Sequence, residues 1–516
     1  MTKKPSVAII GGGHNGLICA AYLARAGLKV TVFEAQDKVG GALAQHTLSD
    51  GAAASSLVPS HYPLNSAIVK ELKLKGATGT TPAAINTTLL NAEGAHITIS
   101  GNKISDPGCD AQTKADFQAF REEYLGYAAA LKALMLSTPP RLKNIDWTDK
   151  KTLAKLGLNL RFGLGRDAMR EFLRIVGMNV FDVLEERFGS ELLKGGIAAD
   201  AVFGQHVGPK TPTTVLSMLM RMFQQAGANT ERQCAAVYDL AGQLEAAARA
   251  AKVDIRTGSK VASVIVENDR AAGITLENGE TFKADLVVSN ADAKSTLLGL
   301  VGPQNLDAMF THRISKTRTD GDVARCILLL DRPPEFTGLT STHYYDRLLV
   351  APSMRYVERA FNHSKYGEFS ENPVLDIKIQ RPHTEAGPTP QHTVMTVNAM
   401  FAPYALRQGW RQGKKLFEAR IIETLSEYSP NIGASVVYSE LWTPSDIEEK
   451  FLTTGGHWHH GEVAIDQAFM MRPVPGASQY GMPLPGLYLC GAAAHPGGDI
   501  TGLPGRNAAR RILAEM

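Results

Sequence analysis

Apolar and polar positions near the start of the chain follow the pattern of a βαβ unit. The apolar run at residues 6–10 predicts a short buried strand, and the Ala- and Leu-rich residues 17–26 predict a helix that ends at Gly27. A second apolar run at residues 28–33 predicts another strand. Strand, glycine turn, helix and strand thus follow one another within about thirty residues, as in a βαβ unit.

Two later parts of the chain repeat this α/β pattern. An Ala-rich helix is predicted over residues 243–251, and Asn278-Gly279 is a hairpin signal. Near the C-terminus, a strand over residues 487–490 precedes a Gly- and Pro-rich loop and a helix over residues 502–516. Short strands between the two regions are predicted over residues 253–256, 261–267, 272–276, 280–283 and 285–289.

The segments between these pieces have a different pattern. Residues 70–235 are mainly helical in pattern, and residues 320–475 mix strands and helices with many prolines. We therefore expect a second domain to be inserted into a discontinuous nucleotide-binding domain. The predicted nucleotide-binding domain comprises residues 1–70, 236–318 and 476–516, and the substrate (cap) domain comprises residues 71–235 and 319–475.

Composition supports two domains of a globular enzyme. A chain of 516 residues is too long for one simple core. Its hydrophobic fraction of 44% and charged fraction of 20% are typical of globular enzymes. A formal charge of +3 gives no indication of a nucleic-acid partner. The oligomeric state stays open.

Cysteine usage and the apolar runs indicate the compartment. An odd number of widely spaced cysteines without a CxxC pair predicts free thiols in a reducing compartment and argues against a disulphide-reductase mechanism. The run at residues 7–10 is too short for a signal peptide, and no run reaches the ~18–20 residues of a membrane span. We expect a cytoplasmic protein, with peripheral membrane contact left open. The cysteines are Cys19, Cys109, Cys234, Cys326 and Cys490.

A glycine pattern connects the first strand to the first helix. Gly11, Gly13 and Gly16 satisfy G-x-G-x-x-G: the first permits a tight turn, the second lets the backbone approach a pyrophosphate, and the third lets helix and strand pack closely. Glu34 ends the second strand eighteen residues later, where a carboxylate can accept the ribose hydroxyls. A glycine turn without a ligand is the alternative, but the matching strand, helix and acid favour a dinucleotide site.

Further glycines indicate FAD rather than NAD. Gly40-Gly41 follows Glu34 closely, which is similar to the extended FAD fingerprint of glutathione-reductase-like flavoproteins. Residues 486–491 resemble a late FAD motif of the same proteins. Only one G-x-G-x-x-G is present, so we expect electrons to come from the substrate and to leave to oxygen or another acceptor. Hydroxylases that bind NADPH without a second Rossmann unit stay open.

Motifs over nearly the whole chain carry a family resemblance. They include Asn290-Ala-Asp292, Phe401-Ala-Pro-Tyr404, His460-Gly461-Glu462 and residues 490–508. In them the chain resembles the phytoene desaturase-like FAD oxidoreductases, in the branch of pyridine nucleotide-disulphide oxidoreductase domain-containing protein 2. The resemblance implies an α/β fold, with a Rossmann-like FAD-binding domain of the glutathione-reductase/amine-oxidase type and an inserted α+β substrate (cap) domain. It also implies FAD contacts from His14, Asn15, Ala35, Val261, Asn290 and Gly491.

The same resemblance implies an activity. Members of this family desaturate or oxidise mostly hydrophobic small molecules, so we expect an FAD-dependent enzyme that removes two hydrogens from a C–C or C–N bond. An amine oxidase, a lipid- or prenyl-binding escort protein on the same fold, and an NADPH-dependent flavin monooxygenase are the alternatives.

Catalytic candidates cluster near the C-terminus. Asp499 is a candidate acid or base, and a ribityl contact or a helix cap is the alternative role for this carboxylate. Thr501-Gly502 begins the last predicted helix, whose N–H groups can stabilise negative charge on reduced flavin. His457, His459 and His460 form an aromatic cluster in which one imidazole can transfer protons. A metal site is disfavoured, because only Glu462 adds a ligand at the usual spacing.

A Met-rich stretch precedes the second nucleotide-binding piece. Ordinary core is the more common explanation, and an apolar tunnel or a membrane contact is the alternative. Its apolar residues are Met218, Met220, Met222 and Phe223.

Overall fold

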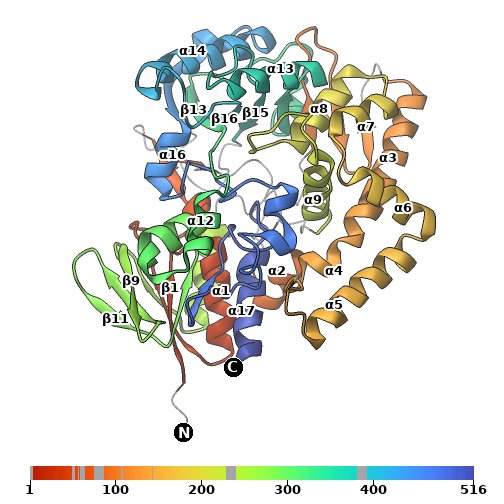
Figure 1. The fold of residues 1–516 in the computed structure, drawn as a ribbon. Helices are drawn as coiled ribbons and strands as arrows, with labels where there is room; N and C mark the ends of the chain where they lie inside the picture. Colours follow the sequence, from red (N-terminus) through yellow and green to blue (C-terminus); the bar gives the residue numbers. More distant parts are fainter. Residues whose placement is uncertain are drawn as a thin grey trace.

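A parallel sheet of five strands forms the centre of the lower half of the molecule in Figure 1. The strand order is β18-β12-β1-β2-β8, so the N-terminal strand lies in the middle. The five strands are β1 (Ser6–Ile10), β2 (Lys29–Phe33), β8 (Asp254–Arg256), β12 (Leu286–Ser289) and β18 (Leu487–Leu489). The computed structural model describes residues 4–48, 53–55, 57, 64–74, 86–105, 109–141, 143–227, 240–380 and 392–516.

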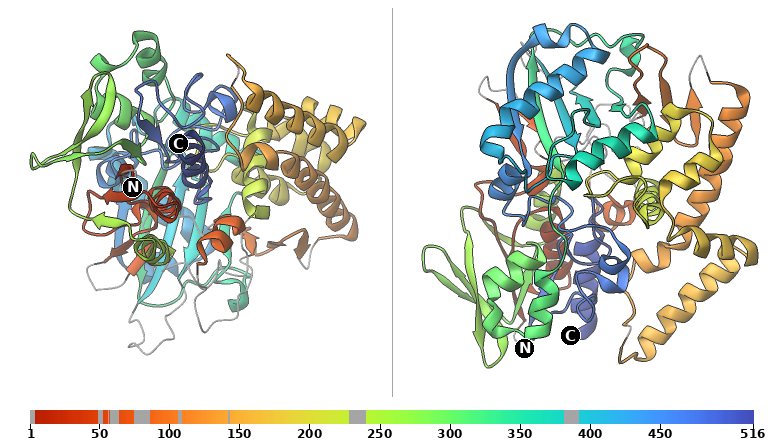
Figure 2. Two further views of the ribbon diagram at one scale, coloured as in Figure 1. Left: turned by 90° about the horizontal axis from the view of Figure 1, so that it is seen from below. Right: turned by 45° about the horizontal axis from the view of Figure 1, so that its top comes forward.

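Three helices accompany this sheet, and Figure 2 shows two of them, α1 and α17, side by side. They are α1 (His14–Arg25), α11 (Leu240–Ala250) and α17 (Leu503–Glu515). Helix α1 begins three residues before the predicted start, because Gly13 is its N-cap and the helix follows the glycine turn directly. Its residues 15–21 and Leu23 are buried, since it also contacts α17 and α11.

A small antiparallel sheet lies beside the parallel one. It consists of β9 (Val261–Glu267), β10 (Arg270–Leu276) and β11 (Thr281–Lys283). The predicted hairpin turn joins β10 to β11, and Gly279 takes a φ of 87° there. Figure 1 places this sheet at the outer edge of the nucleotide-binding part.

An eight-stranded sheet forms the upper half of the molecule (Figure 1). Its order is β17-β13-β16-β15-β14-β5-β6-β7, and only β14 and β5 pair in parallel. Three of its strands lie within residues 70–235, which the sequence predicts to be mainly helical. The strands are β5 (Thr87–Leu89), β6 (Ile97–Ser100), β7 (Lys103–Ser105), β13 (Val323–Leu330), β14 (Arg347–Val350), β15 (Leu375–Ile379), β16 (Thr393–Met400) and β17 (Val436–Trp442). A separate pair is β3 (Gln45–Thr47) and β4 (Ala53–Ser55).

Helices cover this sheet and extend from one side of it (Figure 1). One face packs against α14, whose Phe417, Ile421 and Leu425 are buried in the same core cluster as the strands. The remaining α-helices are α2 (Ser66–Leu72), α3 (Ala111–Ala130), α4 (Lys132–Met135), α5 (Trp147–Leu158), α6 (Arg166–Ile175), α7 (Val180–Arg187), α8 (Glu191–Ala201), α9 (Thr214–Gly227), α12 (Ala308–Ser315), α13 (Met354–Lys365), α14 (Trp410–Tyr428), α15 (Ile432–Ser435) and α16 (Pro444–Phe451).

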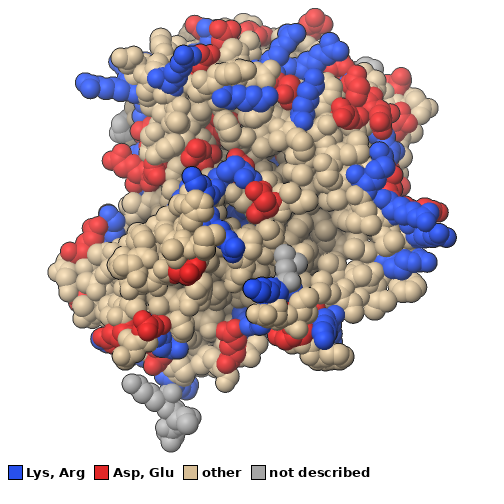
Figure 3. Space-filling model, in the orientation of Figure 1, with Lys and Arg blue, Asp and Glu red and all other residues tan. Residues whose placement is uncertain are grey.

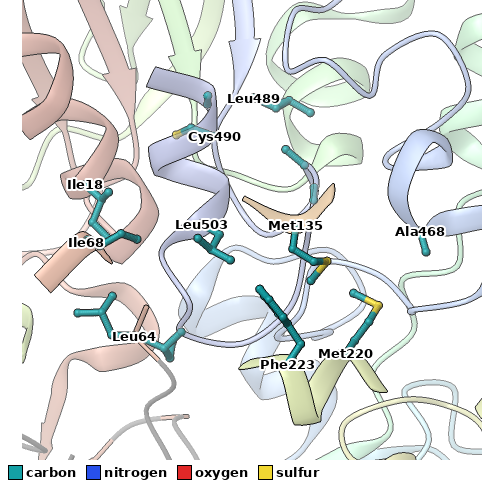
Figure 4. Packing of buried hydrophobic residues seen from close by; sticks show 14 of the residues in the cluster. Ile18, Leu64, Ile68, Met135, Met220, Phe223, Ala468, Leu489, Cys490 and Leu503 are labelled. Carbon is teal, nitrogen blue, oxygen red and sulfur yellow. The ribbon is translucent and has the colours of Figure 1, made fainter. Parts of the chain in front are cut away.

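The Met-rich stretch lies on α9 and is part of the core. Its three methionines and Phe223 are at most 6% exposed. Figure 4 shows Met220 and Phe223 close to Met135 and Leu503, which come from α4 and α17. The stretch therefore joins the cap helices to the nucleotide-binding part.

The cysteines and the domain boundaries complete the description. Cys19, Cys326 and Cys490 form no disulphide bond among the described residues, and Cys234 lies outside them. The boundaries at residues 70, 318 and 475 stay predictions, and the boundary at residue 235 falls outside the described residues. Within the described ranges, no helix combines the length and the apolar composition needed to cross a bilayer.

Candidate functional site

A cavity of about 650 Å³ lies beyond the carboxyl ends of β1, β2 and β12. Gly11 follows β1, Glu34 follows β2, and Asn290 follows β12, and all three line it. Open α/β sheets bind their ligands at this edge, where the strand order reverses around the first strand. The opposite wall comes from the cap, through residues such as Trp442 and Phe451.

Backbone atoms pack closely around the glycine turn. A Cβ at Gly13 would lie 2.7 Å from Asn290 Nδ2, and a Cβ at Gly16 would lie 2.2 Å from the Gly11 carbonyl oxygen. Gly11 has a φ of 91°, which a side chain disfavours. Gly40 donates its N–H to the Gly12 carbonyl at 3.0 Å, so the second glycine pair lies directly against the first.

Glu34 is held at the same turn. Its carboxylate accepts the Gly12 N–H at 2.7 Å and the Gln36 N–H at 2.9 Å. Since a carboxylate has about four acceptor positions, these two bonds leave capacity for ribose hydroxyls. The glycine turn and this acid together fit the adenosine and pyrophosphate of FAD, because no side chain fills the turn and the acid lines the cavity.

Ten of the fifteen predicted cofactor residues line the cavity, and five do not. The ten are Gly11, Gly13, His14, Asn15, Glu34, Ala35, Gly41, Val261, Asn290 and Asp499. The other five occupy supporting positions: Gly16 and Gly491 allow close packing, Gly40 contacts the glycine turn, Thr501 accepts the Asn65 N–H, and Gly502 is the N-cap of α17.

Asp499 lies between two basic side chains at the far end of the cavity. One carboxylate oxygen is 3.2 Å from His459 Nε2, and the other accepts from Arg221 Nη1 at 3.1 Å. Burial opposes ionisation, but Arg221 and His459 outweigh it and lower the pKa of Asp499 to about 2. Asp499 also has a φ of 29°, a strained value for a residue other than glycine. At neutral pH it is therefore a paired carboxylate.

The ion pair of Asp499 continues into the cap. Arg221 also donates to Asp200 at 2.8 Å, and Arg347 donates to the same Asp200 oxygen at 2.8 Å. Arg347 in turn donates to the buried Asp376 at 3.1 Å. Four cap elements, α8, α9, β14 and β15, are thus connected to one wall of the cavity by charged side chains.

Two neutral imidazoles also line the cavity. His14 Nε2 and His460 Nδ1 have no hydrogen-bond partner among the described residues. Burial lowers the pKa of each to about 4, and their mutual repulsion adds to the lowering at His14. Buried polar atoms are normally bonded, so unpartnered nitrogens in a cavity are available to a ligand.

The other two histidines of the cluster have different positions. His457 is 1% exposed, is absent from the cavity wall, and accepts the His459 N–H at Nδ1. His459 faces the cavity beside Asp499. Of the three predicted catalytic residues, the structure therefore places Asp499 and His460 in the cavity and His457 behind it. No metal-binding group of three His, Cys, Asp or Glu side chains occurs among the described residues.

Arg472 holds this histidine loop in place. Its buried guanidinium has no carboxylate partner among the described residues and donates only to backbone carbonyls. Burial lowers its pKa to about 10, so it stays charged at neutral pH. The acceptors are the carbonyl oxygens of His459, Gly461, Glu462, Gln467 and Ala492.

Sequence reasoning missed one group on the cap side of the cavity. His46 packs edge-on against Trp442, with ring centroids 4.8 Å apart, and its Nε2 lies 2.9 Å from Glu440. Trp442 Nε1 donates to the same carboxylate at 2.6 Å. His46 and Glu440 are 394 residues apart, and neither belongs to a motif that could have identified them.

Comparison with known proteins agrees with this geometry. Residues 16–348 match the family model described as flavin containing amine oxidoreductase. An engineered putrescine oxidase has the same fold, with a TM-score of 0.61 and 15% identity over 99% of this chain and 98% of its own. The predicted fold class, α/β with a Rossmann-like FAD-binding part, is confirmed.

Two curated relatives match over almost their whole length. Pyridine nucleotide-disulfide oxidoreductase domain-containing protein 2 of Mus musculus is 29% identical over 98% of this chain and 93% of its own. One of the subunits of limonene dehydrogenase from Castellaniella defragrans is 25% identical over 100% of this chain and 95% of its own. The predicted family resemblance is thereby confirmed, as are the FAD cofactor and the oxidoreductase class.

Proposed function

The chain belongs to the family of flavin-containing amine oxidoreductases, and from this premise we propose that it removes two hydrogens from an apolar organic substrate. The reaction desaturates or oxidises the substrate, and the electrons pass to oxygen or another acceptor. The name of one relative, which is part of a limonene dehydrogenase, supports a dehydrogenation.

The observation that carries this proposal is the neutral character of the catalytic end of the cavity. Among the carboxylates that line the cavity, Asp499 is the one bonded to a histidine of this cluster, His459, and it is already paired with Arg221. The imidazoles of His14 and His460 are uncharged at neutral pH because burial lowers their pKa. Apolar side chains also line the cavity, among them Leu57, Leu300, Trp458 and Ile500.

This arrangement favours apolar substrates over alkylammonium substrates. A buried cation is stable only when an acidic or other electron-rich partner compensates its desolvation. A carboxylate that already pairs with Arg221 offers less compensation than a free one. An amine oxidase of cationic amines is therefore the weaker candidate.

The protein's own residues would bind and orient the reactants. Bound FAD supplies a two-electron acceptor. The glycine turn and Glu34 would hold its adenosine and pyrophosphate. His460 presents an unpartnered Nδ1 that can accept a substrate proton. Asp499 orients His459 through the bond to Nε2, and Arg472 fixes the loop that carries both histidines.

The test is a reduction screen on the FAD-loaded protein. Polyenes, monoterpenes, steroids, cyclic ketones and amines are added without oxygen, and the flavin band near ~450 nm is followed. We expect bleaching by one of the apolar classes and none by NADPH alone. Bleaching by primary amines alone would establish an amine oxidase, and bleaching by NADPH alone would establish a monooxygenase. An apolar ligand that binds without bleaching would identify an escort protein.

Asp499→Asn sharpens the same experiment. The variant keeps FAD but lowers the rate of bleaching at least about tenfold, or ~1.4 kcal/mol of barrier, because His459 loses its charged partner. Since the pKa of Asp499 is about 2, its charge is constant above about pH 4. Titration of Asp499 itself should therefore make no contribution to the pH dependence of the wild-type rate above this value. Asp331→Asn, at an exposed position, is the matched control.

A further inference from the structure

A helical arm at the edge of the cap exposes several large apolar side chains. It comprises residues 141–175 and contains α5, the π-helical turn Asn159–Gly163 and α6. Figures 1 and 2 show α5 and α6 at the periphery of the molecule, away from the eight-stranded sheet. Four of its apolar side chains are more than half exposed, namely Trp147 (80%), Leu158 (55%), Phe162 (75%) and Leu173 (59%).

Helix α5 has two distinct apolar faces. At 100° per residue, Trp147, Ala154 and Leu158 fall within about 40° of one another on the side that faces solvent. Leu153 and Leu156, on the other side, are half-buried. The helix therefore buries one face against the protein and presents a second apolar stripe to solvent, which a helix that only packs on its own core does not need.

Cationic side chains surround this stripe. Lys150 lies on one side of it, and Lys151 and Lys155 lie on the other. The arm has nine Lys or Arg and four Asp or Glu, a formal charge of +5. The whole chain has +3, so the remainder of the chain has −2. Figure 3 shows blue side chains gathered at the right-hand edge, over α6.

We propose that this arm binds the surface of a membrane that contains anionic phospholipids. An exposed apolar stripe bordered by lysines is the pattern of a helix that lies in the lipid interface. Trp side chains prefer the headgroup level, where Trp147 would insert at the start of α5. The lysines and arginines would contact lipid phosphates, whose negative surface potential complements the charge of the arm.

A second copy of the chain fits this surface less well. A two-fold symmetric contact brings the same patch of both copies together, so two faces of +5 would meet. Nucleic acid would satisfy the charge but not the apolar stripe, because phosphates are poor partners for exposed Leu158 and Phe162. A lipid surface satisfies both features at once.

This inference goes beyond the proposed function and does not rest on it. Membrane binding can be measured without any substrate, so its failure and a failure to find a substrate are separate results. If both proposals hold, the arm would bring the enzyme to the phase in which an apolar substrate dissolves.

Vesicle flotation tests the proposal on the FAD-loaded protein. The probes are vesicles of phosphatidylcholine alone and of an equimolar mixture with phosphatidylglycerol. We expect flotation with the mixed vesicles that decreases with added salt, and at least about tenfold weaker binding to phosphatidylcholine alone. Equal binding to both vesicles, or no binding to either, overturns the proposal.

Two matched variants locate the contact. Trp147→Ser/Phe162→Ser should weaken binding to mixed vesicles at least about tenfold. The control Met309→Ser/Leu416→Ser, which removes two other exposed apolar side chains, should bind as wild type does. Lys150→Gln/Lys151→Gln/Lys155→Gln should lose the salt-sensitive part of binding, whereas Lys29→Gln/Lys103→Gln/Lys415→Gln should keep it. Variants of the arm that bind like wild type contradict the proposal.

Trp147 provides a direct spectroscopic readout. The chain has four tryptophans, and Trp410 and Trp442 are buried while Trp458 is half-buried in the cavity wall. Mixed vesicles that contain brominated lipid should quench the emission of the wild type and leave that of Trp147→Phe unquenched, although the variant still floats. Dimer formation through the arm would identify a second copy of the chain as the partner instead. Displacement of the protein from the vesicles by duplex DNA, added at the same total negative charge as the lipid, would identify nucleic acid.

Discussion

At the residue scale, Gly13 shows how little space the nucleotide turn leaves. The atom that a larger residue would meet is the amide nitrogen of Asn290, whose side chain also lines the cavity. Asn290 follows β12, and Gly13 precedes α1, so their contact is decided by the pairing of β1 with β12. A methyl group here would occupy the space through which a phosphate approaches the backbone.

Gly13→Ala is therefore expected to weaken FAD binding at least about tenfold, or ~1.4 kcal/mol. Titration of the apoprotein with FAD, followed by flavin fluorescence, measures this effect. Gly126→Ala is the control, because a Cβ at Gly126 on α3 meets no atom within 4 Å. Equal FAD affinity of the Gly13 variant and the wild type would contradict the assignment of the turn.

At the element scale, the cap is joined internally by a buried ion pair. Arg347 on β14 and Asp376 on β15 have side chains that are 3% and 1% exposed. Asp376 and Asp200 raise the pKa of Arg347 further, against the effect of its burial. Removal of one partner leaves an uncompensated buried charge, which costs far more than the pair itself contributes.

Arg347→Met is expected to lower the free energy of unfolding by about 3–5 kcal/mol. Arg347→Met/Asp376→Leu should regain most of this loss, because no buried charge remains without a partner. Arg420→Met, which removes an exposed pair with Glu423, should cost at most about 1 kcal/mol. Urea unfolding of the FAD-loaded variants provides the values, and a double variant no more stable than the single one would refute the explanation.

At the scale of the whole molecule, buried neutral histidines couple stability to pH. Burial lowers the pKa of His495 to about 4 and holds that of His457 well below 6.5. Between about pH 4 and about pH 6.5 the unfolded chain binds protons that the folded chain excludes. The free energy of unfolding therefore rises with pH in this window. When the pH falls from about 7 to about 5.5, each such histidine lowers the free energy of unfolding by roughly 1 kcal/mol.

His495→Gln should reduce this pH dependence by roughly 1 kcal/mol. The measurement is the free energy of unfolding of the FAD-loaded protein at the two pH values. His312→Gln, at an exposed position on α12, should leave the dependence unchanged. A pH dependence identical in wild type and the His495 variant would show that His495 does not carry the effect.

The sequence alone determined the nucleotide-binding part in some detail. Strand β1 and strand β9 have the predicted bounds, and the other predicted elements of this part differ by at most three residues. Local rules are sufficient here, because glycine positions and short apolar runs determine a βαβ unit within one stretch of chain. The FAD cofactor followed from the same local motifs.

Only the tertiary structure decided the composition of the cavity and the shape of the cap. The strands β5 to β7 join a sheet whose other strands all come later in the sequence, the first of them starting at Val323. No local pattern predicts a pairing between strands so far apart in the sequence. The partners of Asp499, namely Arg221 and His459, come from α9 and from the loop before β18. Their proximity depends on how the cap packs on the parallel sheet, and so does the burial that keeps His14 and His460 neutral. Packing, and not local sequence, sets the charge of the site.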